Sequence, residues 1–267
     1  YIVTIDFKDA FGSVPHKLIK HNLLDIGFAK PFVKSIMSSY DHCCTKIVSN
    51  GGMSEAIPFG KGVKQGCPLS PTLFNICIEP LLRKLNDMAV VDGYHWFNKA
   101  TSVQAYADDI ILFSDTEDGM CNLIKKVEEF CQFAGDMVIN PKKCSSLSYV
   151  ISNGARSTIS SNFCIGNSDD DSNLIENVNL QGFTPYLGLP LAAHVSRKKH
   201  HIFQKILNMK HDVYKISSSS LKTTQVIDAI KRFILPKLDY ELLINAAPTT
   251  KLEELDAFIR SCISKKI

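Results

Sequence analysis

The sequence predicts an α+β fold, with a mixed domain over residues 1–193 and a helical domain over residues 194–267. Short apolar runs typical of strands alternate with helical patterns only in the first part. The charge also changes there, because residues 1–193 hold 16 basic and 20 acidic side chains, whereas residues 194–267 hold 14 basic and 7 acidic ones. The net charge of +3 therefore averages an acidic part and a basic part, of which the basic part suits phosphate backbones.

The chain is expected to begin with a strand. Residues 1–5 (YIVTI) are mostly β-branched or aromatic, and they run into the acidic turn Asp6–Asp9. The stretch 45–59 predicts a hairpin, because Asn50-Gly51-Gly52 is a turn signal. Between these two features, helical periodicity predicts two helices, over residues 16–26 and 31–40.

The middle of the chain predicts a long helix followed by an acidic hairpin. Residues 59–71 (FGKGVKQGCPLSP) are punctuated by Gly and Pro, and they lead into an amphipathic helix over 72–88. The apolar runs 101–107 and 110–114 flank Asp108-Asp109, which predicts a hairpin with the two acids at its turn.

The rest of the chain is expected to be helical, apart from one long connection. Residues 152–177 are rich in Ser, Asn and Gly, which is typical of loops between short strands. The remaining helices are predicted over residues 118–135, 196–216, 221–235 and 251–265.

Composition excludes several classes of protein. No apolar run approaches the roughly 20 residues of a membrane span, so no membrane segment is expected. The nine cysteines are scattered without a CxxC pair, which indicates reduced thiols in an intracellular protein, nuclear and cytoplasmic. Because the chain opens at Tyr1 on a strand-like run, we expect it to be a fragment.

Three carboxylates are candidates for chemistry. Asp6 ends a strand and Asp108-Asp109 occupy a turn, so strand ends can bring them together across 102 positions of sequence. Neighbouring carboxylates repel one another, and a hard divalent cation such as Mg²⁺ removes that penalty. Two such ions stabilise the attacking and leaving oxygens in phosphoryl transfer. A plain hairpin turn remains the alternative explanation of the Asp-Asp pair.

An ordered series of motifs adds a family resemblance. VTIDFKDAFGSVPH is followed by GVKQGCPLSPTLFN, AYADDIILFS, INPKKC and YLGLPL. This series, spread over residues 1–191, resembles that of reverse transcriptases, especially non-LTR retrotransposons of the site-specific, restriction-like-endonuclease type. The resemblance implies a polymerase palm, an antiparallel sheet packed on helices, over residues 1–193 with part of the fingers. It also implies a helical thumb and connector over residues 194–267, with the fingers largely absent from this chain.

The resemblance implies roles for residues near the first strand and the acidic turn. Asp6 and Asp108 match the catalytic metal ligands, with Asp109 as their partner, for two Mg²⁺ ions or Mn²⁺ in their place. Phe11 matches the steric gate that excludes a 2′-OH, and the small Ala10 lets ring and sugar approach. Phe7 belongs to the same expected dNTP and template site.

Further motifs extend the implied site. Gln65-Gly66 match the template and nucleotide pocket, and Lys143, with Lys142 as its competitor, matches the lysine that protonates the leaving pyrophosphate. Tyr186-Leu187-Gly188 match the primer grip. Basic residues of the last third, with their near-helical spacing, are expected to contact nucleic-acid backbones, and they include Lys198, Lys199, Lys205, Lys210 and Lys215.

The implied function is RNA-directed DNA polymerisation, with an RNA template, a DNA primer or target and dNTPs as partners, no membrane partner, and an oligomeric state that the sequence does not define. Because the basic fingers that hold the triphosphate precede the first aspartate in this family, the isolated fragment is expected to be poorly active. One alternative is a retrotransposon relic that binds nucleic acid without catalysis. Others are a group II intron maturase-like protein and a template-copying RNA polymerase, and Phe11 argues against the last.

Overall fold

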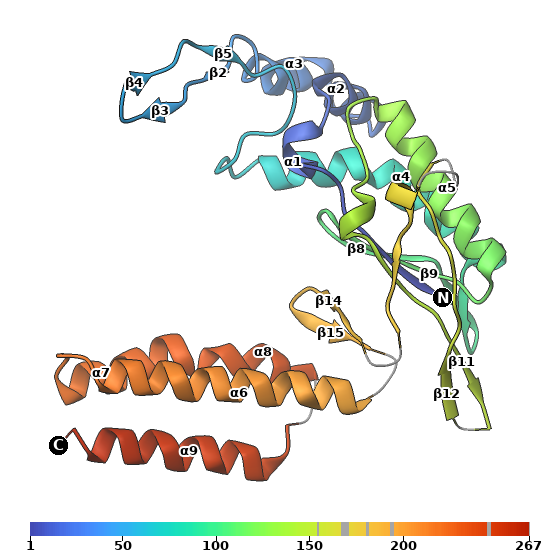
Figure 1. The fold of residues 1–267 in the computed structure, drawn as a ribbon. Coiled ribbons are helices and arrows are strands. Elements are labelled where there is room, and N and C mark those ends of the chain that lie inside the picture. The colour runs from blue at the N-terminus through green and yellow to red at the C-terminus, as the bar shows by residue number, and fades with distance from the viewer. Residues whose placement is uncertain (154, 167–170, 180–181, 193–194, 245–246, 267) are drawn as a thin grey trace. The chain divides into compact units, whose positions relative to one another are not determined.

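The computed structural model describes residues 1–153, 155–166, 171–179, 182–192, 195–244 and 247–266 (Figure 1). Two compact units make up the chain: residues 1–150 with 158–178, and residues 151–157 with 179–267. The boundary between the two units lies near residue 178. The sequence analysis predicted a domain boundary at residue 193, and that boundary stays a prediction. In the part of the chain that is described, no helix is long and apolar enough to cross a membrane.

A five-stranded sheet forms the centre of the first unit. Its order is β13-β10-β1-β9-β8, and β1 pairs antiparallel with both of its neighbours. The strands are β1 (Ile2–Ile5), β8 (Val103–Tyr106), β9 (Asp109–Phe113), β10 (Ser145–Leu147) and β13 (Glu176–Asn177). The sheet packs on helices, so the predicted α+β class is confirmed.

The central position of β1 follows from its side chains. Val3 and Ile5 are buried, and β9 adds a continuous buried run from Ile110 to Leu112. Such apolar strands are covered on both faces, which requires neighbours in the sheet and helices against it. The register pairs Ile5 with Ile110 and Val3 with Leu112, so the two runs lie side by side.

Four main helices belong to the first unit, and each matches a helix that the sequence predicts. In Figure 1, α4 and α5 run next to each other beside β8 and β9, and α2 packs on α4. Their bounds are α2 (His16–Asp25), α3 (Lys30–Ser38), α4 (Ser70–Asp92) and α5 (Glu117–Ala134). The buried face of α4 repeats at helical spacing, through Leu73, Cys77, Leu81 and Leu85.

Short elements complete the first unit. The predicted 45–59 hairpin is present as paired short strands around Asn50-Gly51, but the sequence did not predict α1 or the hairpin β6–β7. The short elements that begin in this unit are α1 (Ala10–Ser13), β2 (Cys44–Thr45), β3 (Val48–Ser49), β4 (Gly52–Met53), β5 (Ile57–Pro58), β6 (Tyr94–Trp96), β7 (Lys99–Thr101), η1 (Pro141–Lys143), β11 (Tyr149–Ser152) and η2 (Asp171–Asn173). The strand β12 (Ala155–Thr158) pairs with β11.

A proline inside α4 is compensated by a side chain of α2. Pro80 has no N–H, so it cannot donate to the carbonyl of Ile76 one turn earlier. The buried Asn22 amide fills this gap, because its Nδ2 donates to Ile76 O at 3.1 Å and to Cys77 O at 3.2 Å. Asn22 thus joins α2 to α4 and satisfies a carbonyl that the proline leaves free.

We predict that Asn22→Leu lowers the free energy of unfolding by about 1–3 kcal/mol, because it leaves a buried carbonyl without a donor. Pro80→Ala restores the N–H, so the same Asn22→Leu change is expected to cost less in the Pro80→Ala background. Urea denaturation of the two single variants and the double variant measures the coupling. Strictly additive changes would contradict the assignment.

The second unit is helical, with one small hairpin. The strands β14 (Thr184–Tyr186) and β15 (Leu189–Leu191) pair antiparallel through a tight turn. The helices are α6 (Val195–Ser217), α7 (Thr223–Ala229), α8 (Pro236–Ile244) and α9 (Thr249–Ser264). Their core includes Ile202, Ile206, Met209 and Val213 of α6, which recur at helical spacing.

The predicted helix over 221–235 corresponds to two pieces in the structure, α7 and the turn that follows it. After α7, the turn η3 (Ile230–Ile234) is π-helical, with the Leu235 N–H donating to Ile230 O at 3.0 Å. Pro236 then opens α8, which the sequence analysis did not predict. Because proline lacks the N–H that would continue the hydrogen-bond ladder, the wider turn before it is the local adjustment to Pro236.

The lysines of α6 do not share one stripe. At 3.6 residues per turn, Lys205 and Lys210 lie about 140° apart around the helix, on opposite sides of its buried face. Lys210 is mostly buried, pairs with Glu254 at 3.6 Å and lies over the Phe258 ring. Lys215 is exposed. The sequence analysis grouped these lysines by their spacing along the chain, because the packing of α9 against α6 cannot be seen in the sequence.

Candidate active site

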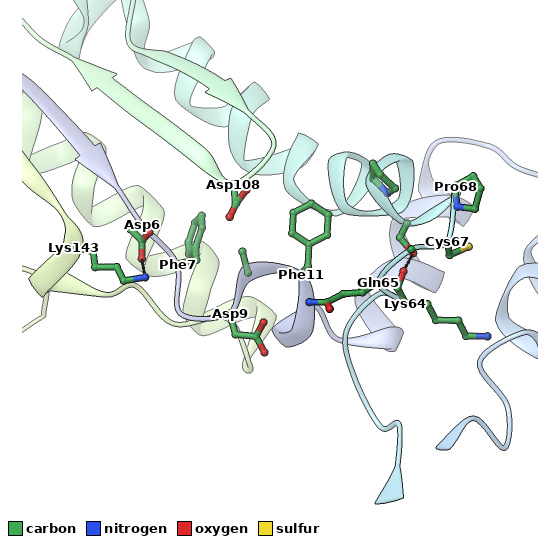
Figure 2. A pocket seen from close by; sticks show the side chains of 14 residues that line it. Asp6, Phe7, Asp9, Phe11, Lys64, Gln65, Cys67, Pro68, Asp108 and Lys143 are labelled. Atoms are coloured by element: carbon green, nitrogen blue, oxygen red, sulfur yellow. Dashed lines mark hydrogen bonds and ion pairs between the residues drawn. The ribbon is translucent and has the colours of Figure 1, made fainter. Parts of the chain in front are cut away.

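A cavity of about 640 Å³ brings together residues from four separate segments of the first unit (Figure 2). Eight of the predicted site residues line it: Asp6, Phe7, Ala10, Phe11, Gln65, Gly66, Asp108 and Lys143. The cavity is also lined by residues that the sequence analysis did not assign: Asp9, Lys64, Cys67, Pro68, Ser70 and Pro71. All six lie inside the motifs quoted above, so the spacing of the motifs was the signal that could have found them.

Asp6 leaves the end of β1 at a point held by backbone contacts. Its N–H donates to the buried Cys144 Sγ at 3.4 Å, and its carbonyl accepts from the Asn140 N–H at 2.8 Å. Burial raises the pKa of the Cys144 thiol to about 11, so this sulfur stays neutral beside the carboxylate. The backbone of Asp6 is therefore fixed on the side of β10.

The β8–β9 turn presents the other two acids. Tyr106 pairs with Asp109, so Ala107 and Asp108 form a two-residue loop, with Ala107 at a φ of 54°. Asp108 lines the cavity from this loop, and Asp109 is the first residue of β9. One step beyond the pair Ile5–Ile110, the antiparallel register brings Asp6 alongside Asp109.

The three carboxylates act on one another electrostatically. The pKa of Asp109 is raised, first by partial burial and then by the charges of Asp108 and Asp6. Asp109 does not line the cavity, and within the described ranges no three His, Cys, Asp or Glu side chains form a cluster that could hold a metal.

The donor set nevertheless fits a hard cation. Asp6 Oδ2 is buried and, within the described part of the chain, accepts no hydrogen bond. Within the described residues its cationic neighbour is Lys143, whose Nζ lies 3.9 Å away. A buried carboxylate oxygen without a donor, facing a cavity that a second carboxylate also lines, is an oxygen ligand of the kind that Mg²⁺ prefers.

Phe11 serves both the core and the cavity. Its ring stacks on the fully buried Phe74 ring of α4, with centroids 4.4 Å apart and planes inclined by 14°. Phe11 is half-buried, so one part of the ring remains at the cavity wall. Ala10 and Phe7 beside it are buried, and both reach the same wall.

Main-chain bonds hold the Gln65-Gly66 loop against Phe11. The Val63 N–H donates to Phe11 O at 2.8 Å, and the Gly62 N–H donates to Val14 O at 2.7 Å. Gly62 has a φ of 87°, and a Cβ there would lie 2.7 Å from Gly12 O, so no side chain fits. Gly66 also has a positive φ of 81°. The loop therefore lies on the α1 turn although 54 positions separate Phe11 from Gln65.

Lysines and a cysteine add charge and reactivity to the cavity wall. Lys143 lines the cavity, whereas its competitor Lys142 does not. Lys64 Nζ donates to Ser39 O and lies 5.1 Å from the centroid of the Tyr40 ring. The pKa of Cys67 is lowered, first by the backbone N–H of Leu69 and then by Ser70 and Lys64.

The other predicted residues belong to the second unit. Tyr186 ends β14, and Leu187-Gly188 form the turn to β15 with φ values of 50° and 77°, as two-residue hairpin turns require. Lys198 and Lys199 lie on α6, but their side chains are outside the described residues. Lys205 is half-buried on the same helix. Their roles stay predictions.

The motifs that form the cavity belong to a match along most of the chain. Residues 1–191 match the family described as reverse transcriptase (RNA-dependent DNA polymerase). The chain belongs to the reverse transcriptase family. Members of this family generally use divalent metal ions, which agrees with the oxygen ligands at the cavity.

Relatives of this reverse transcriptase domain are Pol polyproteins of retrotransposable elements. It is 28% identical over 263 residues to the Retrovirus-related Pol polyprotein from type-2 retrotransposable element R2DM of Drosophila melanogaster, covering 97% of this chain and 24% of that polyprotein. It is 29% identical over 265 residues to the corresponding type-1 element R2 polyprotein of Popillia japonica, covering 99% of this chain and 42% of that one. The expected relation to non-LTR retrotransposons is confirmed, and the endonuclease type stays a prediction.

The chain thus spans well under half of the length of these two relatives. Among solved structures, a telomerase of Candida tropicalis in complex with a fragment of telomeric RNA resembles the whole chain, at 11% identity and a TM-score of 0.45, over 46% of that protein. This score is too low to bear on the fold.

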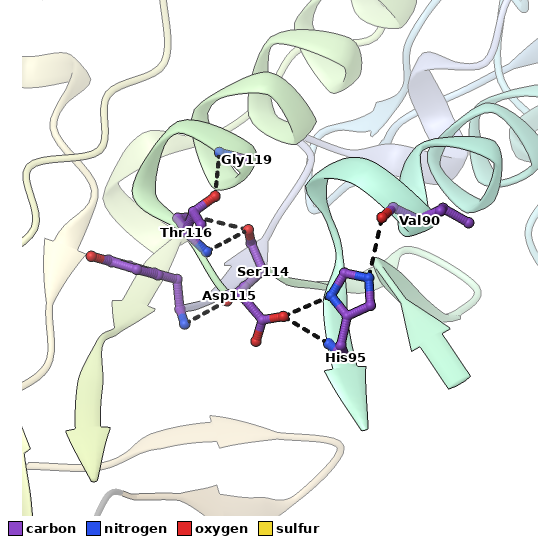
Figure 3. Close-up of polar contacts among 7 residues, drawn as sticks. Val90, His95, Ser114, Asp115, Thr116 and Gly119 are labelled. Carbon is purple, nitrogen blue, oxygen red and sulfur yellow. Dashed lines mark hydrogen bonds and ion pairs between the residues drawn. The ribbon is translucent and has the colours of Figure 1, made fainter. Parts of the chain in front are cut away.

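At the other end of β9, a histidine supports the strand of the reverse transcriptase domain that begins with Asp109 (Figure 3). Asp115 Oδ2 accepts from His95 twice, from the backbone N–H at 3.0 Å and from Nδ1 at 2.7 Å. His95 Nε2 lies 3.1 Å from Val90 O. Both ring nitrogens face oxygens that only accept, so both bonds form only when the ring is protonated.

We predict that this contact makes stability depend on pH. The pKa of His95 is raised, first by its bond to Asp115 and then by Val90, above the ordinary value of about 6.5. A raised pKa means that the stabilisation is complete below the ordinary value and is lost as pH rises through the folded pKa. The midpoint difference between the wild type and His95→Ala should therefore be largest in acid and shrink above neutral pH.

Thermal melts of both proteins across pH 5–9 check this, because the difference cancels groups common to the two. Asp115→Asn should remove most of the pH dependence. A difference that is constant, or that grows in alkali, would contradict the assignment.

Proposed function

We propose that this chain is the palm and thumb part of an RNA-directed DNA polymerase, which adds dNTPs to a primer 3′-OH on an RNA template. The observation that carries the proposal is the single cavity lined by Asp6, Phe11, Gln65, Asp108 and Lys143. Membership of the reverse transcriptase family indicates the class of reaction, and the cavity with its charged side chains indicates where on the chain the reaction would take place.

Asp6 and Asp108 would hold two divalent ions, Mg²⁺ or Mn²⁺, between the sheet and the α1 turn. When bound, such ions stabilise negative charge on the attacking and leaving oxygens of a phosphoryl transfer. The fixed backbone of Asp6 and the tight loop around Asp108 position these ligands before any nucleotide binds. Asp109 adds a third carboxylate from β9. The repulsion among the three carboxylates would be relieved by bound cations.

Phe11 would discriminate between the deoxyribose and the ribose of the incoming nucleotide. Its ring cannot retreat, because the fully buried Phe74 lies directly behind it. A 2′-OH on the incoming nucleotide would therefore clash with the Phe11 ring. This clash favours dNTPs over rNTPs, so the product is DNA. The alternative of a template-copying RNA polymerase is not favoured by this arrangement.

Gln65 and Lys143 would complete the chemistry. Gln65 is exposed at the cavity, where its amide can donate and accept toward a base or sugar. Lys143 is 69% exposed and close to Asp6, so its ammonium can reach a leaving pyrophosphate and give it a proton. Its neighbour Lys142 does not line the cavity.

The partners would be an RNA template, a DNA primer or target and dNTPs. In the second unit, Tyr186-Leu187-Gly188 would hold the primer end, and the basic residues Lys198, Lys199 and Lys205 of α6 would contact the phosphate backbone. The nuclear and cytoplasmic location belongs to the same proposal. A relic that binds nucleic acid without catalysis is less favoured, because eight of the predicted site residues, including Asp6 and Asp108, line one cavity.

We predict that the chain binds Mn²⁺ through Asp6 and Asp108. Loss of either charge should weaken binding roughly tenfold or more, because carboxylate charge sets the affinity of such sites. Electron paramagnetic resonance of free Mn²⁺ during titration measures binding without requiring activity. Asp9→Asn is the matched control, since Asp9 lines the same cavity at a φ of 47° that Asn tolerates. Equal losses in all three variants would contradict the assignment.

We predict that primer extension on an RNA template requires Asp108 and selects dNTPs through Phe11. Phe11→Val should raise rNTP use relative to dNTP use by roughly tenfold or more, because it removes the wall that meets the 2′-OH. The assay is run on this chain and on a longer version with the preceding segment of its own reading frame. Unchanged selection by Phe11→Val, or extension that survives Asp108→Asn, would contradict the proposed roles.

A further inference from the structure

A group of exposed apolar side chains lies at one end of α4 and on the hairpin β6–β7. We call it the hairpin patch, and it comprises Val90, Val91, Trp96 and Phe97, which are exposed by 75%, 82%, 62% and 90%. None of these residues lines the cavity described above. Large apolar side chains clustered in this way are typical of interaction sites rather than of a solvated surface.

Phe97 occupies a backbone conformation that disfavours it. The pair Trp96–Lys99 closes the hairpin, so Phe97 and Asn98 form its two-residue loop. Such loops favour Gly, Asn or Asp where φ is positive, yet Phe97 has a φ of 52°. A bulky residue in this region is strained, and it gains no burial in return. Neither backbone preference nor burial therefore accounts for an aromatic ring at the tip of this hairpin.

The hairpin patch is held in place before any partner binds. The Trp96 ring contacts Phe97 edge-on at 5.3 Å and lies 6.4 Å from the Tyr94 ring. His95 fastens the strand on both sides, to Val90 at the end of α4 and to Asp115 after β9. A preformed aromatic surface costs little entropy to dock against, because its side chains are already ordered.

The surroundings of the hairpin patch are acidic. Residues 87–101 and 115–118 contain five carboxylates and one lysine, and these are Asp87, Asp92, Asp115, Glu117, Asp118 and Lys99. Asp87 lies one turn before Val90 and Val91 on the same side of α4. Asp115 contacts the hairpin directly through His95. The apolar side chains are thus bordered by negative charge.

We propose that the hairpin patch docks a protein segment that carries apolar and basic side chains together. Apolar side chains of the partner would cover Trp96 and Phe97, and its Lys or Arg residues would meet the surrounding carboxylates. Nucleic acid is disfavoured, because its phosphates would meet segments in which carboxylates outnumber lysines five to one. A symmetric contact with a second copy is disfavoured for the same reason, since it would bring identical acidic borders together.

The chain carries its own reporter for this test, because Trp96 is its only tryptophan. A Trp-free amphipathic peptide of Leu and Lys is titrated into the full 267-residue chain, and a Leu and Glu peptide of equal length serves as the comparison. Saturable binding of the Lys peptide, with a blue shift of Trp96 emission, is expected. The Glu peptide is expected to give no shift.

Phe97→Asn is the decisive variant, because Asn suits a positive φ and the change should not lower the melting temperature. It should nevertheless weaken binding of the Lys peptide about tenfold, as expected for an aromatic anchor. Phe133→Ser is the matched control, since Phe133 is an exposed aromatic residue on α5 outside the hairpin patch, and it should leave binding unchanged. Removing two border charges, with Asp87→Asn and Asp118→Asn, should weaken binding and flatten its salt dependence.

Three results would overturn the proposal. One is equal binding of the Lys and Glu peptides, or binding that Phe97→Asn does not change. Another is saturable quenching of Trp96 by single-stranded DNA at lower concentrations than the Lys peptide requires, which would assign the hairpin patch to nucleic acid. The third is a blue shift on raising the protein concentration alone, which would assign it to a second copy. None of these readouts depends on polymerase activity, so the proposed function can fail separately.

Discussion

The antiparallel register between β1 and β9 is the constraint on which the candidate site depends. Pairing of Ile5 with Ile110 sets the end of β1 beside the β8–β9 turn, so residues 102 positions apart come together through main-chain bonds alone. A slip of one residue would turn Asp6 to the opposite face and expose the apolar run of β1. The buried side chains of Val3 and Leu112 oppose such a slip. Burial of the core therefore fixes the position of the acids.

The rest of the cavity is assembled on this register by backbone contacts. The loop that carries Gln65 is tied to the α1 turn at Phe11 and Val14, and the segment that carries Lys143 is tied to Asp6 through Asn140. Main-chain bonds do not depend on side-chain charge, so they can hold like charges close together. The pKa of Asp109 is raised, first by partial burial and then by Asp108 and Asp6, so repulsion between like charges adds to the cost of ionising this group. A divalent cation would repay it, which links the stability of the site to its chemistry.

Sequence patterns predicted the features that depend on local periodicity or on motif spacing. Helices α2, α3, α4, α5, α6 and α9 were recovered within a few residues of their ends, and eight of the residues that line the cavity were assigned from the motifs. Features that depend on distant partners were not predicted. The Asn22 contact with the carbonyls beside Pro80 joins two helices. The π-helical turn before Pro236 is a local adjustment, and the helix that follows it was missed. The α6 lysines were grouped by spacing, although Lys210 turns toward Glu254 of α9. The β6–β7 hairpin was missed because its turn places Phe where turn residues are expected.

The excess of acidic residues in the first unit matters most where carboxylates have few basic side chains near them. Many exposed acids there are neutralised locally, as in the pairs Lys61–Asp136 and Arg83–Glu79. Among the described residues, the ion pair at the cavity is the long contact of Lys143 with Asp6, and the ion pair at the hairpin patch is the titratable contact of His95 with Asp115. An uncompensated charge costs free energy wherever water is displaced from it. Both places would recover that cost by binding a cationic group, a metal ion inside the cavity and basic side chains on the hairpin. Opposite ends of β9 would thus apply the same electrostatic principle to two different ligands.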